Sequence, residues 1–179
     1  MKITPQLFEH LRPRLPEEVA RCTELSKSPQ CWSRHHFEPG HFTASAFVLH
    51  PSESSILLIK HKKLGFWLQP GGHIHAEDGT VERAARRELV EETGVAALNV
   101  IGKPGIPFDI DIHQIPTRPN EPAHLHFDLR FAYRATMSGL RAQEEEVDGI
   151  EWAPLKSLNH VDTDASVRRS AQLLNLRDI

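Results

Sequence analysis

The apolar positions along the chain change their spacing near residue 41, and this change divides the sequence into two parts. Before it, apolar residues recur at near-helical spacing from Leu7 to Leu25, interrupted by two prolines, which predicts one or two short helices and then a loop. After it, short apolar or alternating runs separated by turn residues indicate strands. These strands are expected at residues 42–49, 55–60, 66–69, 96–103, 107–114, 124–135 and 149–154.

Two further segments have a helical period. In the segment 80–93, Thr80 is a favourable N-cap, Glu82 suits the first turn and Gly94 suits the position after the last turn. A C-terminal helix is expected at 164–176. Short strands mixed with a few helices predict an α/β (α+β) fold, of the α+β or α/β/α sandwich class. We expect two parts, an N-terminal helical arm at 1–40 and a domain at 41–179.

The helix expected at 80–93 departs from the usual amphipathic pattern. Its apolar face begins with Val81 and Ala84, and one turn further on the same face carries three carboxylates instead of leucine or valine. Like charges at these spacings repel, and the C-terminal end of a helix disfavours negative charge, so a cation site is preferred to a solvated acidic patch. Carboxylates without cysteine favour a hard divalent ion, Mg²⁺ or Mn²⁺. The three carboxylates are Glu88, Glu91 and Glu92.

The sequence around this helix resembles the Nudix box. From Gly72 to Val95 it reads GHIHAEDGTVERAARRELVEETGV, and the second half matches the box pattern R-E-apolar-x-E-E-x-G-apolar at every specified position. The first half departs from the pattern, because Asp78 stands where a glutamate is expected and eight residues instead of seven separate it from Arg87. One extra loop residue before the helix would accommodate this difference. The resemblance covers residues 41–175.

The resemblance implies an α/β/α sandwich with a mixed sheet, and hydrolysis of a nucleoside diphosphate linked to another group. By position, Glu88, Glu91 and Glu92 would bind the metal ions beside the carbonyl of Gly71, and Arg87 would orient a glutamate. Divalent ions suit this chemistry because they screen the charge of a pyrophosphate and lower the pKa of a bound water.

The residue that deprotonates the attacking water stays open. In proteins that this sequence resembles, the base lies either in the box or in a later loop. Glu145 belongs to an acidic run just before the last expected strand, where such a loop residue would lie. A solvated loop is the alternative interpretation of that run.

A second pattern joins histidines and aspartates on two expected strands. They alternate with apolar residues, so each trio lies on one face of its strand, and the proline-rich link 114–123 permits antiparallel pairing. We prefer the interpretation that these polar side chains face water. The alternative is a substrate pocket or an auxiliary metal site, in which His73 of the box loop could contact substrate phosphates. The trios are Asp109, Asp111 and His113, and His124, His126 and Asp128.

Composition and charge exclude several classes of protein. The chain has 179 residues and a formal net charge of -3, which argues against a protein that coats nucleic acid or binds an anionic membrane. It has no apolar run long enough to cross a bilayer and no signal peptide pattern. Only two cysteines, Cys22 and Cys31, are present, so we expect a reduced, cytoplasmic protein.

The sequence leaves the substrate and the partners open. A nucleoside triphosphate or a nucleotide sugar such as ADP-ribose is the expected substrate of a Nudix-type hydrolase, and a homodimer is compatible with the chain. A Nudix-fold sensor that binds nucleotide without rapid turnover is the main alternative, although the intact carboxylates argue against it. For most single histidines, including His41, we expect a surface or packing role.

Overall fold

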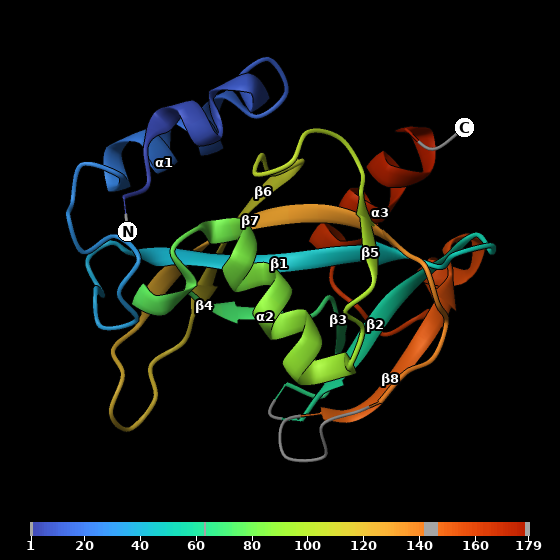
Figure 1. The fold of residues 1–179 in the computed structure, drawn as a ribbon. Helices are drawn as coiled ribbons and strands as arrows, with labels where there is room; N and C mark the ends of the chain where they lie inside the picture. Colours follow the sequence, from blue (N-terminus) through green and yellow to red (C-terminus); the bar gives the residue numbers. More distant parts are fainter. Residues whose placement is uncertain (1, 63, 142–146, 178–179) are drawn as a thin grey trace. The chain divides into compact units, whose positions relative to one another are not determined.

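The computed structural model of the protein describes residues 2–62, 64–141 and 147–177 (Figure 1). The backbone forms two compact units, and each draws on three separate stretches of the chain. The first unit comprises Met1–Ser45, Gly72–Ala85 and Gly105–Phe131. The second unit comprises Ala46–Gly71, Arg86–Pro104 and Ala132–Ile179.

The N-terminal residues belong to the first unit. They form two 3-10 helices, Pro5–Leu7 and Glu9–Leu11, and then the helix α1 (Pro16–Leu25), coloured blue in Figure 1. α1 begins with a proline, whose missing N–H would have no partner within the helix in any case. It packs against the strand β6 (Asp109–Ile115). The side chains that α1 buries are Val19, Cys22 and Leu25.

The first unit also contains an antiparallel pair formed by β6 and the part of β7 (His124–Ala135) up to Phe131. In this pair His113 lies opposite His126, and Asp111 lies opposite Asp128, so the predicted pairing of the two polar trios is confirmed. The first residue of β1 (Gly40–Leu49) approaches the start of β7 so closely that only glycine fits.

The second unit is built around β2 (Ser55–His61), whose first five residues are all buried. β2 pairs antiparallel with β1 at Leu49 and Ile56, so these two consecutive strands form a hairpin. It also pairs with two further strands, and β5 pairs with the end of β7. The remaining elements of this unit are β3 (Trp67–Leu68), β5 (Leu98–Val100), β8 (Val147–Pro154), the 3-10 helix Leu155–His160 and α3 (Ala165–Arg177).

The helix α2 (Val81–Thr93) has the ends that the sequence predicts. At its start the hydroxyl of Thr80 accepts a hydrogen bond from the N–H of Arg83 at 3.2 Å, which satisfies one of the free donors of the first turn. At its end Gly94 adopts a φ of 70°, a left-handed conformation that glycine reaches without strain. Local capping chemistry therefore defines this helix.

Most predicted elements are present, and the differences are short elements. β4 (Gly71–His73) and a 3-10 helix at Ala76–Asp78 occupy a segment predicted as a loop, and β5 is shorter than predicted. Elements of three residues are too short to show a detectable periodicity in the sequence. They also depend on hydrogen bonds to other segments of the chain, which the local sequence does not reveal. The predicted α+β fold with a mixed sheet is confirmed. No helix within the described residues combines the length and hydrophobicity of a membrane span.

Candidate functional site

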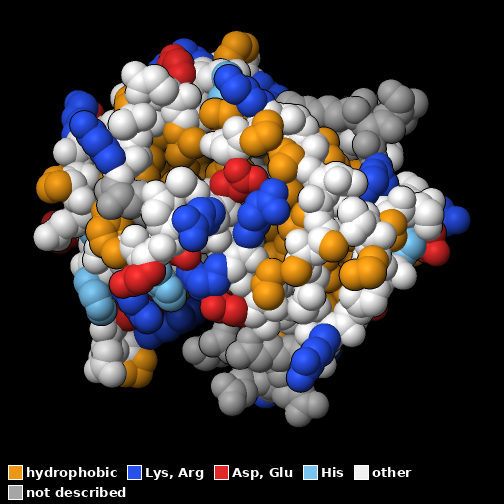
Figure 2. Space-filling view, viewed as in Figure 1, with side chains coloured by type: hydrophobic (Ala, Val, Ile, Leu, Met, Phe, Trp, Pro, Cys, Tyr) orange, Lys and Arg blue, Asp and Glu red, His pale blue; other side chains and the backbone are white. Residues whose placement is uncertain are grey.

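The three carboxylates that interrupt the apolar face of α2 differ in exposure. Glu92 is buried, with 5% of its surface exposed. The side chain of Glu88 is 13% exposed, whereas that of Glu91 is 51% exposed. Figure 2, drawn in the orientation of Figure 1, shows acidic and basic side chains intermingled over α2. A buried carboxylate needs a compensating partner, because removing a charge from water is costly.

One partner of Glu92 is Gly71, the first residue of β4, which follows the turn after β3. The backbone N–H of Gly71 donates a hydrogen bond to Oε2 of Glu92 at 2.9 Å. The preceding carbonyl, that of Pro70, accepts the N–H of Ala46 at 2.9 Å, so β1 holds this turn in place. The glycine and the glutamate that sequence reasoning assigned to one metal site are therefore in direct contact.

Arg87 lies between the two other carboxylates. Its Nη1 is 2.9 Å from Oε1 of Glu88 and 2.9 Å from Oε2 of Glu91. One guanidinium thus fixes the orientation of both side chains through charge-assisted hydrogen bonds. Among these four side chains, three negative charges face one positive charge. Such an oxygen-rich, net negative group is chemically suited to a hard divalent cation.

The sequence leaves the roles of two acidic residues open, Asp78 and Glu145, and the structure describes only the first of them. Oδ2 of Asp78 accepts the N–H of His75 at 2.7 Å, and Asp78 is 6% exposed. Asp78 therefore caps the 3-10 helix Ala76–Asp78, which precedes α2. Glu145, the candidate base, lies outside the described residues.

In the first unit, histidines from three strands gather into one group. The rings of His41 and His126 are 4.7 Å apart, and the ring of His73 lies 5.2 Å from His41 and 5.3 Å from His126. One ligand nitrogen from each of these three residues lies within 4.8 Å of the others. His124 stacks beside this group, 5.1 Å from His41.

Burial keeps these histidines neutral at pH 7. It is the main cause that lowers the pKa of His41 to about 4, of His73 to about 3 and of His126 to about 2. At His73 and His126 the neighbouring His41 lowers the pKa further, because two protonated rings would repel each other. The group therefore presents uncharged imidazoles.

The remaining members of the polar trios form an ionic network around Arg130. Its Nε is 3.1 Å from Asp128, and its terminal nitrogens lie 3.3 Å from Asp111 and 3.8 Å from Asp109. Arg14 of the N-terminal segment also contacts Asp109, at 2.8 Å.

This network corrects the preferred interpretation that the trios face water. Asp109 is fully buried, and Asp128, Arg130 and His124 are each at most 3% exposed. His113, by contrast, is partly exposed. Burial is the largest single influence and opposes its protonation, but the hydrogen bond to Asp111 and the negative charges of Asp128 and Asp111 together raise the pKa of His113. Alternation locates a polar face, but it does not show whether other chain segments cover that face.

Sequence reasoning missed two residues of these clusters. His41 was expected to have a surface or packing role, yet it supplies the third nitrogen of the histidine group. Arg130 continues the alternation of His126 and Asp128 on β7, and this period was the available signal for it. No comparable local signal marks His41, because its neighbours in the group come from other strands.

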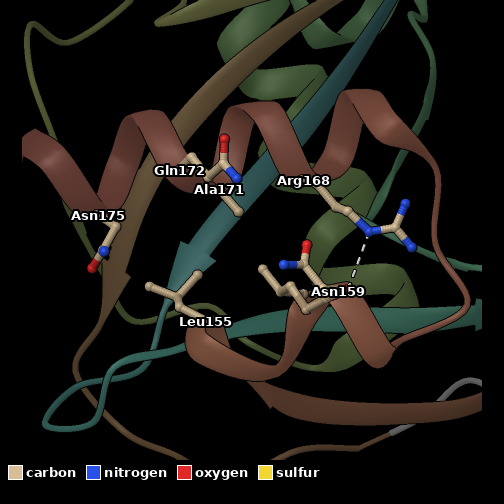
Figure 3. A pocket seen from close by; sticks show the side chains of 7 residues that line it. Leu155, Asn159, Arg168, Ala171, Gln172 and Asn175 are labelled. Carbon is tan, nitrogen blue, oxygen red and sulfur yellow. Dashed lines mark hydrogen bonds between the residues drawn. The ribbon is translucent and has the colours of Figure 1, made fainter.

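Two hollows in the described part of the second unit contain none of the predicted site residues. The smaller, between α3 and the 3-10 helix before it, has a volume of about 70 Å³ (Figure 3). Its arginine, Arg168, already donates hydrogen bonds to the carbonyls of Leu158 and Val161. A nucleotide needs a site of about 300 Å³ or more, so this hollow is too small to hold one.

Comparison with known proteins places the chain in a family. Residues 39–174 match the NUDIX domain, which is well over half of the sequence, and the chain belongs to the NUDIX family. A Bacillus subtilis (strain 168) protein named "Putative 8-oxo-dGTP diphosphatase" is 34% identical over 113 residues, which cover 62% of this chain. The aligned part spans 66% of that relative, just under two thirds of its length.

Solved structures share the fold. A hydrolase of the NUDIX family from Clostridium perfringens has a TM-score of 0.58 and 23% identity, over 75% of this chain and 97% of that chain. A C. elegans Ap4A hydrolase in a binary complex has a TM-score of 0.61 and 13% identity, over 75% of this chain and 95% of that chain. These likenesses, with the family match, confirm the predicted family and fold class.

Proposed function

We propose that the protein is a pyrophosphohydrolase, which cleaves a pyrophosphate bond in a nucleoside diphosphate linked to another group by attack of water at phosphorus. The carboxylate face of α2 carries this proposal. There, Glu88 and Glu91 share Arg87, and the buried Glu92 accepts the N–H of Gly71. Membership of the NUDIX family supports the class of reaction.

In this proposal Glu88, Glu91 and Glu92 hold Mg²⁺, with Mn²⁺ as an alternative, and the carbonyl of Gly71 is a further ligand. The fit rests on the donors, which are oxygen atoms with an excess of negative charge around a partly buried position. When bound, such ions screen the pyrophosphate charge and make a bound water more acidic.

The protein side chains then have distinct parts. Arg87 keeps the carboxylates of Glu88 and Glu91 in fixed orientations, and the N–H of Gly71 does the same for Glu92. A carboxylate must also accept the proton of the attacking water. Glu145 is our candidate for this base, and Glu145→Gln is expected to lower kcat with little change in KM.

For the substrate we propose a nucleoside triphosphate. The name of the B. subtilis relative, which refers to 8-oxo-dGTP, supports this class over a nucleotide sugar such as ADP-ribose. Nucleoside triphosphates, oxidised nucleoside triphosphates, dinucleoside polyphosphates and nucleotide sugars should be compared by kcat/KM with Mg²⁺ and with Mn²⁺. Highest kcat/KM for a nucleotide sugar would contradict the proposal for the substrate, but not the proposal for the reaction.

The decisive variant is Glu92→Gln, which removes a charge but keeps nearly the same shape. We expect it to lower kcat by about 100-fold or more, because losing even a supporting partner of a bound metal costs about 10–100-fold. The matched control is Glu77→Gln, an exposed glutamate of the same box, which should leave kcat unchanged.

Circular dichroism would show that both variants fold. Full activity in folded Glu92→Gln would contradict the assignment of the site. Tight nucleotide binding by the wild type without turnover, measured by calorimetry, would support the alternative of a nucleotide sensor.

A further inference from the structure

The first unit contains a group of histidines whose side chains could bind a metal ion. These histidines are different residues from the glutamates of α2. The group comprises His41 of β1, His73 of β4 and His126 of β7, and no carboxylate belongs to it. The three ligand nitrogens lie within 4.8 Å of one another. Three strands, remote in sequence, therefore direct imidazole nitrogens toward a common point.

Two of these rings each have a buried nitrogen without a hydrogen-bond partner among the described residues. They are Nε2 of His41 and Nε2 of His126, and both atoms are inaccessible. His41 as a whole is 0% exposed. A buried polar atom left unsatisfied costs about 1–3 kcal/mol, so two in one group call for an explanation. A cation that accepts both lone pairs would supply it.

The opposite nitrogen of His41 is already fixed. Its Nδ1 lies 3.2 Å from the carbonyl oxygen of His36, so Nδ1 carries the proton and donates it, and Nε2 keeps its lone pair. His124, beside the group, is held in the same way by the carbonyl of Pro122 at 2.8 Å. A backbone carbonyl that orients the far nitrogen of the ring is the usual support of a metal-binding histidine.

A carboxylate near the group adds negative charge. Oε1 of Glu121 is 3.9 Å from Nε2 of His124, and its side chain is 19% exposed. Neutral imidazoles bring no charge to offset that of a divalent ion, so a nearby glutamate makes the environment more favourable for one. Its distance from His124 makes it a neighbour of the group and not one of the three ligands.

The chemistry of the ligand atoms indicates which metal ion would bind here. Mg²⁺ and Ca²⁺ prefer oxygen ligands, whereas imidazole nitrogen suits Zn²⁺ and its transition-metal neighbours. We propose that His41, His73 and His126 bind one Zn²⁺ ion, which leaves a fourth position for water or another ligand. With Zn–N bonds of about 2.0–2.1 Å, the nitrogens must draw together to roughly 3.4 Å, a change that rotation of the side chains can supply.

This zinc site does not rest on the proposed hydrolase activity, and its test does not measure activity. The full chain, stripped with a chelator, is titrated with Zn²⁺ in excess Mg²⁺, so that the α2 carboxylates are occupied. We expect one equivalent of Zn²⁺ per chain, and X-ray absorption at the zinc edge should show imidazole scattering from three histidines. Zinc with only oxygen neighbours, or no stoichiometric binding, would overturn the proposal.

Variants then assign the ligands. His126→Asn and His41→Asn should each raise the dissociation constant for Zn²⁺ by about 100-fold or more. His35→Asn, an exposed histidine of the same unit, should bind as the wild type does, and so should Glu92→Gln. Unchanged affinity in a folded His126→Asn would refute the site. If that variant does not fold, the absorption spectrum of the wild type still decides the question.

Discussion

Arg130 is the residue that holds together a group of largely buried aspartates. Its side chain is 1% exposed and lies within 3.8 Å of Asp109, Asp111 and Asp128. Despite burial, these three carboxylates raise the pKa of Arg130, so the guanidinium stays charged. If one partner of a buried pair is removed, the other is left as an uncompensated charge in a poorly polarisable environment.

Arg130→Met tests this dependence. The substitution keeps most of the volume and removes the charge, so we expect a loss of about 3–5 kcal/mol in the free energy of unfolding, measured with urea. Arg12→Met is the matched control, because Arg12 pairs with Glu9 on the surface and such pairs contribute little. A midpoint for Arg130→Met equal to that of the control would show that the aspartates do not need this arginine.

Residues with local partners were predictable from the sequence, and residues with distant partners were not. Glu88, Glu91 and Glu92 follow from one helical period, and Thr80 follows from a capping preference within one turn. The burial of Asp109 was not predictable, because it depends on Arg14, 95 positions away in sequence. His41 likewise joins its group through strands that the sequence separates widely.

At the scale of elements, the start of β1 makes a tightly constrained contact with the start of β7. Gly40 has a φ of 151°, and a Cβ there would lie 1.8 Å from the carbonyl oxygen of Leu125. The N–H of Leu125 donates to the carbonyl of Pro39 at 3.0 Å, so neither strand can move away without losing that bond. The absence of a side chain at this position therefore sets how β1 and β7 meet at their first residues.

Gly40→Ala should accordingly destabilise the protein by about 3 kcal/mol or more, since the added methyl overlaps backbone and not a flexible side chain. Gly139→Ala is the control, because a Cβ there meets nothing within 4 Å and its φ is not positive. Urea unfolding of both variants measures the difference. Equal stability of the two variants would contradict the steric argument.

Long helices and strands were predictable because their periodicity extends over many residues, whereas short connecting elements were not. α2, β1 and β7 have ten or more residues each, and the predicted ranges overlap the observed ones closely. β4 has three residues, including two glycines, and gives no periodicity to detect. Its existence depends on pairing with β1, a tertiary contact.

At the scale of the whole molecule, the N-terminal segment is integrated into the first unit. Phe8 stacks on Phe42 at 6.1 Å, and Nε2 of His10 lies 2.9 Å from the carbonyl of Pro107. Arg14 contacts Asp109, a fully buried aspartate. We therefore propose that residues 1–40, although mostly outside the segment that matches the family, support the fold of the domain.

Removing residues 1–40 tests this proposal. Phe42 is now 0% exposed, and losing the side chains that cover it should cost several kcal/mol, since each large apolar side chain contributes about 1.5–3 kcal/mol. We expect a lower Tm by circular dichroism, or insolubility. Arg14→Ala in the full chain separates the contribution of the ion pair and should give a smaller loss. An unchanged Tm for the shortened chain would show that the segment is dispensable.

The network around Arg130 also restricts how this sequence can diverge. Any single substitution of Asp109, Asp111, Asp128 or Arg130 changes the balance of charge in a cluster that is largely shielded from water. A neutral replacement at one position becomes tolerable only after a compensating change at another. We expect these four positions to vary together among homologues, so that a descendant either keeps the whole set or has replaced it in linked steps.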